Sequence, residues 1–240
     1  MKKQSIIIIG ATSGIGRALF EKYAVEVNRI GIVGRRTYML DELRQEHPDT
    51  TITATADITK LDEIAETIDA LRTELKDIDL AIVCSGTGDI NASLDYAVER
   101  PTIDTNVMGW TYVVDILYNI LEQQGHGHLV AITSAGGLRG EPMAPAYSAS
   151  KAYQINYMEA LRKKAFKSRA HIIVTDIRPG LVDTAMAKGE GLFWVMPVEK
   201  VAYQIIAAIR KEKSKVYITK RWHFLAIINK SLPFMLFKRM

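Results

Sequence analysis

The stretch Ser5-Ile6-Ile7-Ile8-Ile9-Gly10-Ala11-Thr12-Ser13-Gly14-Ile15-Gly16 holds the strongest local signal in this 240-residue sequence. Four consecutive isoleucines predict a strand that is covered on both faces, as strands of parallel sheets are. The three glycines predict a tight turn into a helix, with backbone N–H groups open to a phosphate group. Taken alone, they fit an ordinary strand-to-helix turn as well.

Strand and helix patterns alternate along the rest of the chain. Strands are predicted at residues 5–9, 29–33, 51–55, 80–84, 128–133, 172–177 and 215–219. Helices are predicted at residues 14–26, 37–46, 62–75, about 101–123, 146–167 and 198–211. This alternation predicts an α/β protein, a single-domain doubly wound Rossmann fold with a parallel sheet of about seven strands. We expect this domain to cover residues 1–220 and a basic amphipathic extension to cover residues 221–240.

The composition limits the class of protein. Apolar residues make up 48% of the sequence and charged residues 24%, which is ordinary for a globular protein. The single cysteine, Cys84, rules out an intramolecular disulfide and fits a reducing, cytoplasmic setting. No run reaches the roughly 18 to 20 apolar residues that a membrane-spanning helix needs. Ile6 to Ile9 is also too short for the apolar region of a signal peptide.

The end of the second predicted strand bears on cofactor choice. An acidic residue there would bind the ribose 2′-hydroxyl of NAD, but the sequence has Gly34-Arg35-Arg36. Two guanidinium groups offer donors to a 2′-phosphate, which predicts NADP(H). The arginines could instead simply begin a solvated helix. Asp57, after the third strand, could accept a bond from the adenine amino group or cap the next helix.

Tyr147 and Lys151 lie four residues apart on a predicted helix and therefore share a face. A tyrosine with an unperturbed pKa near ~10 is a poor base at neutral pH. A neighbouring ammonium would stabilise the phenolate and lower that pKa. Ser134 ends the fifth strand, at the edge where open α/β sheets bind ligands, and its hydroxyl could hold a carbonyl oxygen.

Together these motifs resemble the short-chain dehydrogenase/reductase family over about residues 5–220. The glycine loop matches T-G-x-x-x-G-I-G, with Ile9 in place of the threonine. The resemblance adds Asn106 to Ser134, Tyr147 and Lys151 as the fourth catalytic residue. Arg178-Pro179-Gly180-Leu181-Val182-Asp183-Thr184 resembles P-G-x-V-x-T, a segment that the family uses to hold the nicotinamide carboxamide.

The resemblance implies a set of cofactor contacts and no metal. These contacts are Gly10, Thr12, Ser13, Gly14, Ile15, Gly16, Arg35, Arg36, Asp57, Ile58, Ser85, Gly86, Tyr147, Lys151, Pro179, Gly180, Val182 and Thr184. One segment departs from the family, because N-N-A-G reads Val83-Cys84-Ser85-Gly86 here. The polar contacts of the two asparagines are therefore expected to be remade or missing, while the glycine is kept.

The implied reaction is hydride transfer between nicotinamide C4 and a carbonyl carbon. Tyr147 would give its proton to the forming alkoxide, and Ser134 would polarise the carbonyl. Lys151 would bind the nicotinamide ribose and lower the pKa of the tyrosine. Asn106 would hold a water that connects the lysine to solvent.

Two segments bear on substrate and partners. Leu192-Phe193-Trp194-Val195-Met196 in a lid would favour an apolar substrate, or the same residues would pack on the body of the protein. In the tail, the apolar residues Phe224, Ile227, Ile228, Leu232, Met235 and Leu236 recur at roughly helical spacing. Lys220, Arg221, Lys230, Lys238 and Arg239 flank them. Such a helix could pack on protein, cover the pocket, or lie peripherally on a membrane.

The sequence therefore predicts an NADPH-dependent oxidoreductase that reduces a carbonyl to an alcohol, or the reverse, on an apolar substrate. The family resemblance suggests a homodimer or homotetramer. One alternative is a long-chain 3-oxoacyl or lipid-like ketone reductase at a membrane surface, and another is an NADPH-sensing regulatory protein. The complete Ser-Asn-Tyr-Lys set argues against a pure sensor. Nucleic acid is not a predicted partner, because the basic tail has little aromatic interleaving for base stacking.

Overall fold

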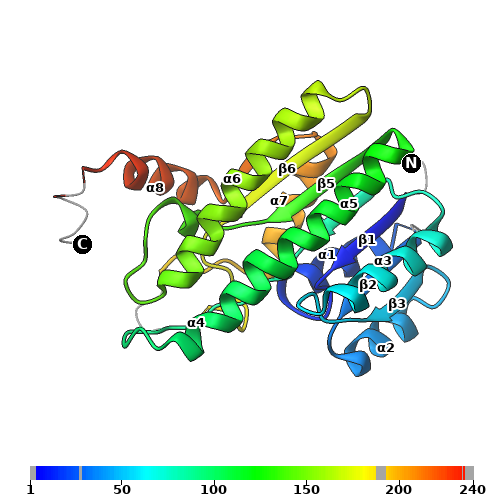
Figure 1. Ribbon diagram of the computed structural model, residues 1–240, viewed down its shortest axis with the longest axis horizontal. Helices are drawn as coiled ribbons and strands as arrows, with labels where there is room; N and C mark the ends of the chain where they lie inside the picture. The colour runs from blue at the N-terminus through cyan, green and yellow to red at the C-terminus, as the bar shows by residue number, and fades with distance from the viewer. Residues whose placement is uncertain (1–3, 27–28, 188–192, 234, 236–240) are drawn as a thin grey trace.

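The computed structural model describes residues 4–26, 29–187, 193–233 and 235. It confirms the α/β fold: seven parallel strands form one sheet in the order β3-β2-β1-β4-β5-β6-β7 (Figure 1). The strands are β1 (Ser5–Ile9), β2 (Arg29–Gly34), β3 (Thr51–Thr55), β4 (Leu80–Val83), β5 (His126–Ile132), β6 (His171–Pro179) and β7 (Lys215–Ile218). The helices are α1 (Gly14–Ala24), α2 (Thr37–Glu46), α3 (Leu61–Leu75), α4 (Tyr96–Ile103), α5 (Trp110–Gln124), α6 (Pro145–Lys167), α7 (Val198–Arg210) and α8 (Lys220–Ser231).

The isoleucine run of β1 is buried on both faces, as the sequence predicts. Ile6 and Ile8 join a core packed against α1, α2 and α7. Ile7 and Ile9 join a second core packed against α3, α5 and α6. Because successive side chains of a strand point to opposite faces, β1 contributes to both cores. Its carboxyl end lies beside that of β4, the central strand of the sheet.

The helix predicted at about residues 101–123 is wrong in detail. The chain instead forms α4, a π-helical segment at Asp104–Gly109, and α5. The first helix starts earlier because the Asp95 side chain accepts a hydrogen bond from Ala97 N at 2.8 Å and caps it. The wider π turn brings Gly109 so close to the loop after β3 that an added Cβ would lie 2.4 Å from the Ile58 carbonyl oxygen. π turns are often found at functional sites, and this one contains Asn106.

The extension begins as a helix, α8, at the side of the molecule opposite α2 and β3 (Figure 1). Its first turn packs on the body: His223 stacks on Tyr217 with ring centroids 4.9 Å apart. Further along, Arg139 donates a hydrogen bond to the Leu232 carbonyl oxygen. Leu236, Lys238 and Arg239 lie outside the described residues. Across the described ranges, no helix is long and apolar enough to cross a membrane.

Candidate active site

A cleft of about 620 Å³ opens where the parallel strands end, on the carboxyl side of the sheet. Every cofactor contact that the sequence predicts lines this cleft, and so does Ser134. Asn106 does not line it and lies behind Gly86, where an added Cβ would be 3.3 Å from the Asn106 Oδ1 atom. The fold therefore brings the predicted residues to one place, as expected at the carboxyl edge of a doubly wound sheet.

The glycine loop forms the floor of the cleft between β1 and α1. Gly10 has φ +90° and Gly14 has φ +54°, a region that favours glycine. A Cβ at Gly16 would lie 2.1 Å from the Gly10 carbonyl oxygen, so the turn has no room for a side chain there. Helix α1 carries no acidic residue in its first turn. Its positive end therefore faces the cleft without a competing carboxylate, which suits a diphosphate.

Arg36 folds over the glycine loop. Its Nη2 atom donates to the Thr12 hydroxyl at 2.7 Å and to the Ser13 hydroxyl at 2.8 Å. The guanidinium is thereby held at the end of β2, next to the start of α1. A phosphate placed there would meet a preformed cation and two hydroxyl groups.

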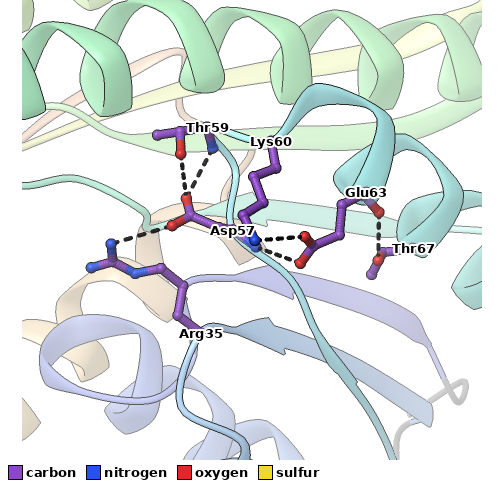
Figure 2. A network of polar contacts seen from close by, with 6 residues as sticks. All are labelled: Arg35, Asp57, Thr59, Lys60, Glu63 and Thr67. Carbon is purple, nitrogen blue, oxygen red and sulfur yellow. Dashed lines mark hydrogen bonds and ion pairs between the residues drawn. The ribbon is translucent and has the colours of Figure 1, made fainter.

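Arg35 points to the other side of the same end of β2 and pairs with Asp57, as Figure 2 shows. The Arg35 Nη1 and Asp57 Oδ2 atoms are 3.5 Å apart. Thr59 donates to Asp57 Oδ1 from its backbone N–H at 3.0 Å and from its hydroxyl at 2.9 Å. Burial opposes ionisation of Asp57, but the bonds from Thr59 and Arg35 outweigh it and lower the pKa of the carboxyl. Asp57 is thus a carboxylate at neutral pH, with its charge partly offset by Arg35.

The loop that carries Asp57 is itself held by helix α3. Asp57 N donates to Glu63 Oε1 at 3.2 Å, and Lys60 pairs with the same carboxylate at 3.4 Å (Figure 2). The Thr67 hydroxyl donates to the Glu63 carbonyl oxygen one turn later. The adenine contact predicted for Asp57 remains a prediction.

Ser134 and Tyr147 both line the cleft, and their side chains are hydrogen-bonded to each other. Ser134 follows β5, and Tyr147 lies in the first turn of α6, which begins at Pro145. Desolvation raises the pKa of the Tyr147 phenol, and its hydrogen bond with Ser134 acts in the opposite direction. Gly88 lets the backbone pass beside the ring, since a Cβ there would be 2.4 Å from Tyr147 Cδ2. The phenol is therefore held in place between a serine hydroxyl and a backbone surface.

Lys151 is buried one turn along α6 from the tyrosine. Its Nζ atom lies 5.8 Å from the centroid of the Tyr147 ring and donates to the Ile132 carbonyl oxygen at 3.3 Å. Burial lowers the pKa of Lys151 to about 8, although the carboxylate of Asp176 acts against this. The group is consequently still mostly an ammonium at neutral pH and can stabilise a phenolate beside it.

The Asn106 side chain is bonded to the backbone that follows Gly86 and to α6. Its Oδ1 atom accepts from Thr87 N at 2.9 Å, and its Nδ2 atom donates to the Thr87 carbonyl oxygen at 2.7 Å and to the Ser150 hydroxyl at 3.0 Å. Cys84 lies nearby, and burial raises the pKa of its thiol to about 12, so it is unreactive at neutral pH.

The sequence reasoning missed Gln154. This fully buried side chain accepts from Lys151 Nζ at 2.9 Å and donates from Nε2 to the Asn106 carbonyl oxygen at 2.9 Å. A side chain thus joins the lysine to the backbone of the asparagine. The water that Asn106 is predicted to hold remains a prediction. The available signal was a polar residue three positions after Lys151, on the same helical face.

The described part of the lid packs on the C-terminal extension. Phe193 stacks on Trp222 with ring centroids 5.6 Å apart, and Arg221 lies over the Trp194 ring. Trp222 in turn lies against Gly180, in the segment that lines the cleft. Leu192 lies outside the described residues. Phe193 and Trp194 are still about half exposed, so they face solvent as well as protein.

Comparisons with a family model and with a related protein agree with each other. A family model described as short chain dehydrogenase matches residues 4–192. An uncharacterized oxidoreductase of Mycobacterium tuberculosis is 30% identical over 226 residues, covering 90% of this chain and 88% of its own.

Solved structures agree in fold. A short-chain dehydrogenase from Streptomyces avermitilis superposes with a TM-score of 0.83 at 22% identity, covering 94% of this chain and 92% of its own. A closed form of serine dehydrogenase complexed with NADP⁺ superposes with a TM-score of 0.79 at 22% identity, covering 88% and 92%. Likeness at this level of identity speaks for the fold alone.

Proposed function

Because the chain belongs to the short chain dehydrogenase family and is an oxidoreductase of that type, we propose that it is an NADPH-dependent enzyme interconverting a carbonyl and an alcohol. One observation carries the proposal. Ser134, Tyr147 and Lys151 gather in the same cleft that Arg36 and the glycine loop line at the end of β1 and β2. A proton-transfer group and a dinucleotide cradle therefore share one cavity.

The cleft residues fit a dinucleotide with a 2′-phosphate. Gly10, Gly14 and Gly16 line the cleft with backbone alone, which leaves N–H groups open to a diphosphate. A Cβ at Gly86 would lie 3.4 Å from Lys151 Nζ. Arg36 is held at the ribose end by Thr12 and Ser13, and no acidic residue follows β2 before α2.

When bound, the nicotinamide would supply or accept the hydride. The Tyr147 phenol gives its proton to the substrate oxygen as the alcohol forms, and takes it back in the reverse direction. The Ser134 hydroxyl, already bonded to that phenol, orients the same oxygen. The Lys151 ammonium stabilises the phenolate and would offer a donor to the ribose. Val182 and Thr184, which line the same cleft, would hold the nicotinamide.

The substrate is proposed to be apolar. The described end of the lid carries the aromatic rings of Phe193 and Trp194, which contact each other. Met186 lines the cleft beside Thr184. Apolar walls with a few placed polar groups are typical of small-molecule sites. A long-chain 3-oxoacyl or lipid-like ketone is a narrower form of this proposal.

A second proposal concerns the extension. Phe224, Ile228 and Met235 are exposed on and after α8, which favours a contact with a second copy of the chain or a peripheral contact with a membrane. The enzyme would then act as a homodimer or homotetramer in the cytoplasm, or at its membrane surface. Sedimentation with anionic liposomes at low salt, beside measurement of the mass in solution, separates the two contacts. A monomer that stays in the supernatant contradicts both.

The enzyme proposal is tested by titrating the protein with NADPH and with NADH, and then screening ketones of increasing chain length for NADPH consumption. We expect tight NADPH binding, turnover that rises with chain length, and loss of turnover in Tyr147→Phe. NADPH binding without turnover on any ketone would favour the sensor. Preference for NADH would contradict the role given to Arg35 and Arg36.

A further inference from the structure

Gln154 occupies a position where its amide has only one workable orientation. Lys151 Nζ is a donor with no acceptor capacity, and the Asn106 carbonyl oxygen is an acceptor with no donor capacity. The amide oxygen must therefore face the lysine and the amide nitrogen must face the carbonyl, as the structure has them at 2.9 Å each. The glutamine amide supplies both groups at once, an oxygen that accepts and a nitrogen that donates.

The hydrogen bonds that link Lys151, Gln154 and Asn106 are buried. Gln154 and Asn106 are both fully buried, and Lys151 is only 3% exposed, so no bulk water replaces a lost partner. Among the described residues, the Nζ atom has two acceptors, the Ile132 carbonyl oxygen and the Gln154 amide oxygen. Its third proton is left for the cleft, which Lys151 lines beside Gly86 and Tyr147.

We propose that Gln154 is a positioning residue for proton transfer: it keeps Lys151 charged and aimed at the cleft by fastening it to the π turn at Asn106. This inference rests on the proposed function, because it assigns a task to Lys151 in that reaction. Gln154 touches neither substrate nor cofactor and acts only through the lysine. The π segment takes part because it presents the Asn106 carbonyl oxygen to α6.

The other groups that face the lysine do not replace this contact. Asp176 on β6 favours the ammonium electrostatically but is bonded to Arg178 at 2.7 Å and to the Thr133 hydroxyl at 2.6 Å. Cys84 after β4 is a neutral thiol at working pH, and Tyr147 on α6 is the group to be activated. The Gln154 oxygen is therefore the side-chain acceptor that holds the ammonium directly.

The test is the pH dependence of NADPH affinity, measured by fluorescence titration without any substrate. In the wild type, affinity should weaken as the pH rises through about 8, because Lys151 then loses its proton and a ribose donor. Lys151→Met should remove this pH dependence, which would show that Lys151 is the group that titrates. Gln154→Met keeps a side chain of similar size but loses the acceptor. The pH at which NADPH affinity weakens should then fall by about one unit, because the lost hydrogen bond stabilises the ammonium in the wild type. Gln154→Glu should raise this midpoint pH, because a carboxylate stabilises the ammonium form of Lys151 more than an amide oxygen does.

A matched control is Tyr157→Phe, which removes another hydrogen bond of α6, from the Tyr157 hydroxyl to Asp115 at 2.6 Å. It should leave the pH dependence at the wild-type position. A merely structural Gln154 would lower the thermal midpoint in Gln154→Met and leave the pH dependence unmoved, and that result overturns the inference. So does a dependence that persists in Lys151→Met.

Failure of the proposed function would look different. Tyr147→Phe that still turns over would overturn the role of the tyrosine, while the shift in Gln154→Met would stand. A wild-type protein that does not bind NADPH would overturn the proposed function and this inference with it.

Discussion

The indole ring of Trp222 lies against Gly180 so closely that an added Cβ on the glycine would come within 2.0 Å of it. Gly180 lines the cleft, and Trp222 belongs to the first turn of α8. Phe193 of the lid stacks on the same indole. The C-terminal extension therefore packs against a residue of the cleft wall, and the Trp222 ring leaves room only for a glycine at this position.

Gly180→Ala should destabilise the protein by about 1–3 kcal/mol, because the indole has to move out of its packing position. Denaturant unfolding measures the change. Gly140→Ala is the matched control, since nothing lies within 4 Å of the Cβ that it adds. Equal stabilities of the two variants would show that Trp222 yields without cost.

Arg36→Ala should weaken NADPH binding by about 10-fold to 100-fold, the range that a charge-assisted hydrogen bond gives. NADH binding should change little, because NADH has no 2′-phosphate. Fluorescence titration with both cofactors measures the ratio, and Arg44→Ala on the same side of the sheet, at the last turn of α2, serves as control. A parallel loss of both affinities would mean that Arg36 only supports the glycine loop through Thr12 and Ser13.

Tyr147→Phe should reduce turnover by about 10²-fold to 10⁴-fold, the contribution of a general acid, while NADPH binding is kept. Tyr153→Phe is a close control, because this tyrosine lies on the same helix and bonds Thr111 at 2.9 Å outside the cleft. Steady-state rates on the best ketone of the screen measure both. Comparable rates for the two variants would remove the tyrosine from the mechanism.

His128 should make the fold less stable in acid. Burial lowers the pKa of this histidine to about 4, below its ordinary value of 6.5. Since the unfolded chain takes up a proton below pH 6.5 and the folded chain does not until about pH 4, stability falls across that window as the pH falls. Between pH 7 and pH 5 the loss should be about 2 kcal/mol.

Urea unfolding at the two pH values checks this, with His128→Gln and His126→Gln compared with the wild type. The first variant should lose the His128 contribution to the pH slope. The second should keep it, because the His126 side chain is about half exposed. An unchanged slope in His128→Gln would place the acid sensitivity elsewhere.

Local chemistry was enough to predict the fold and most of the cleft. The isoleucines of β1, the glycine turn and the four-residue spacing of Tyr147 and Lys151 are patterns that a strand or a helix expresses within a few residues. Parallel strands then bring their carboxyl ends to one edge, so residues such as Ser134 and Gly180 gather without further information.

Contacts between segments that are far apart in the sequence were determined only by the tertiary structure. Gln154 meets Asn106 because a π turn interrupts the helix predicted there, and that turn depends on how Gly109 fits the loop after β3. Trp222 meets Gly180 because β7 returns the chain to the edge of the sheet beside β6. Neither contact can be predicted from sequence periodicity. Periodicity gives the face of a helix or strand on which a side chain lies, whereas the packing of elements decides which side chain of another element it meets.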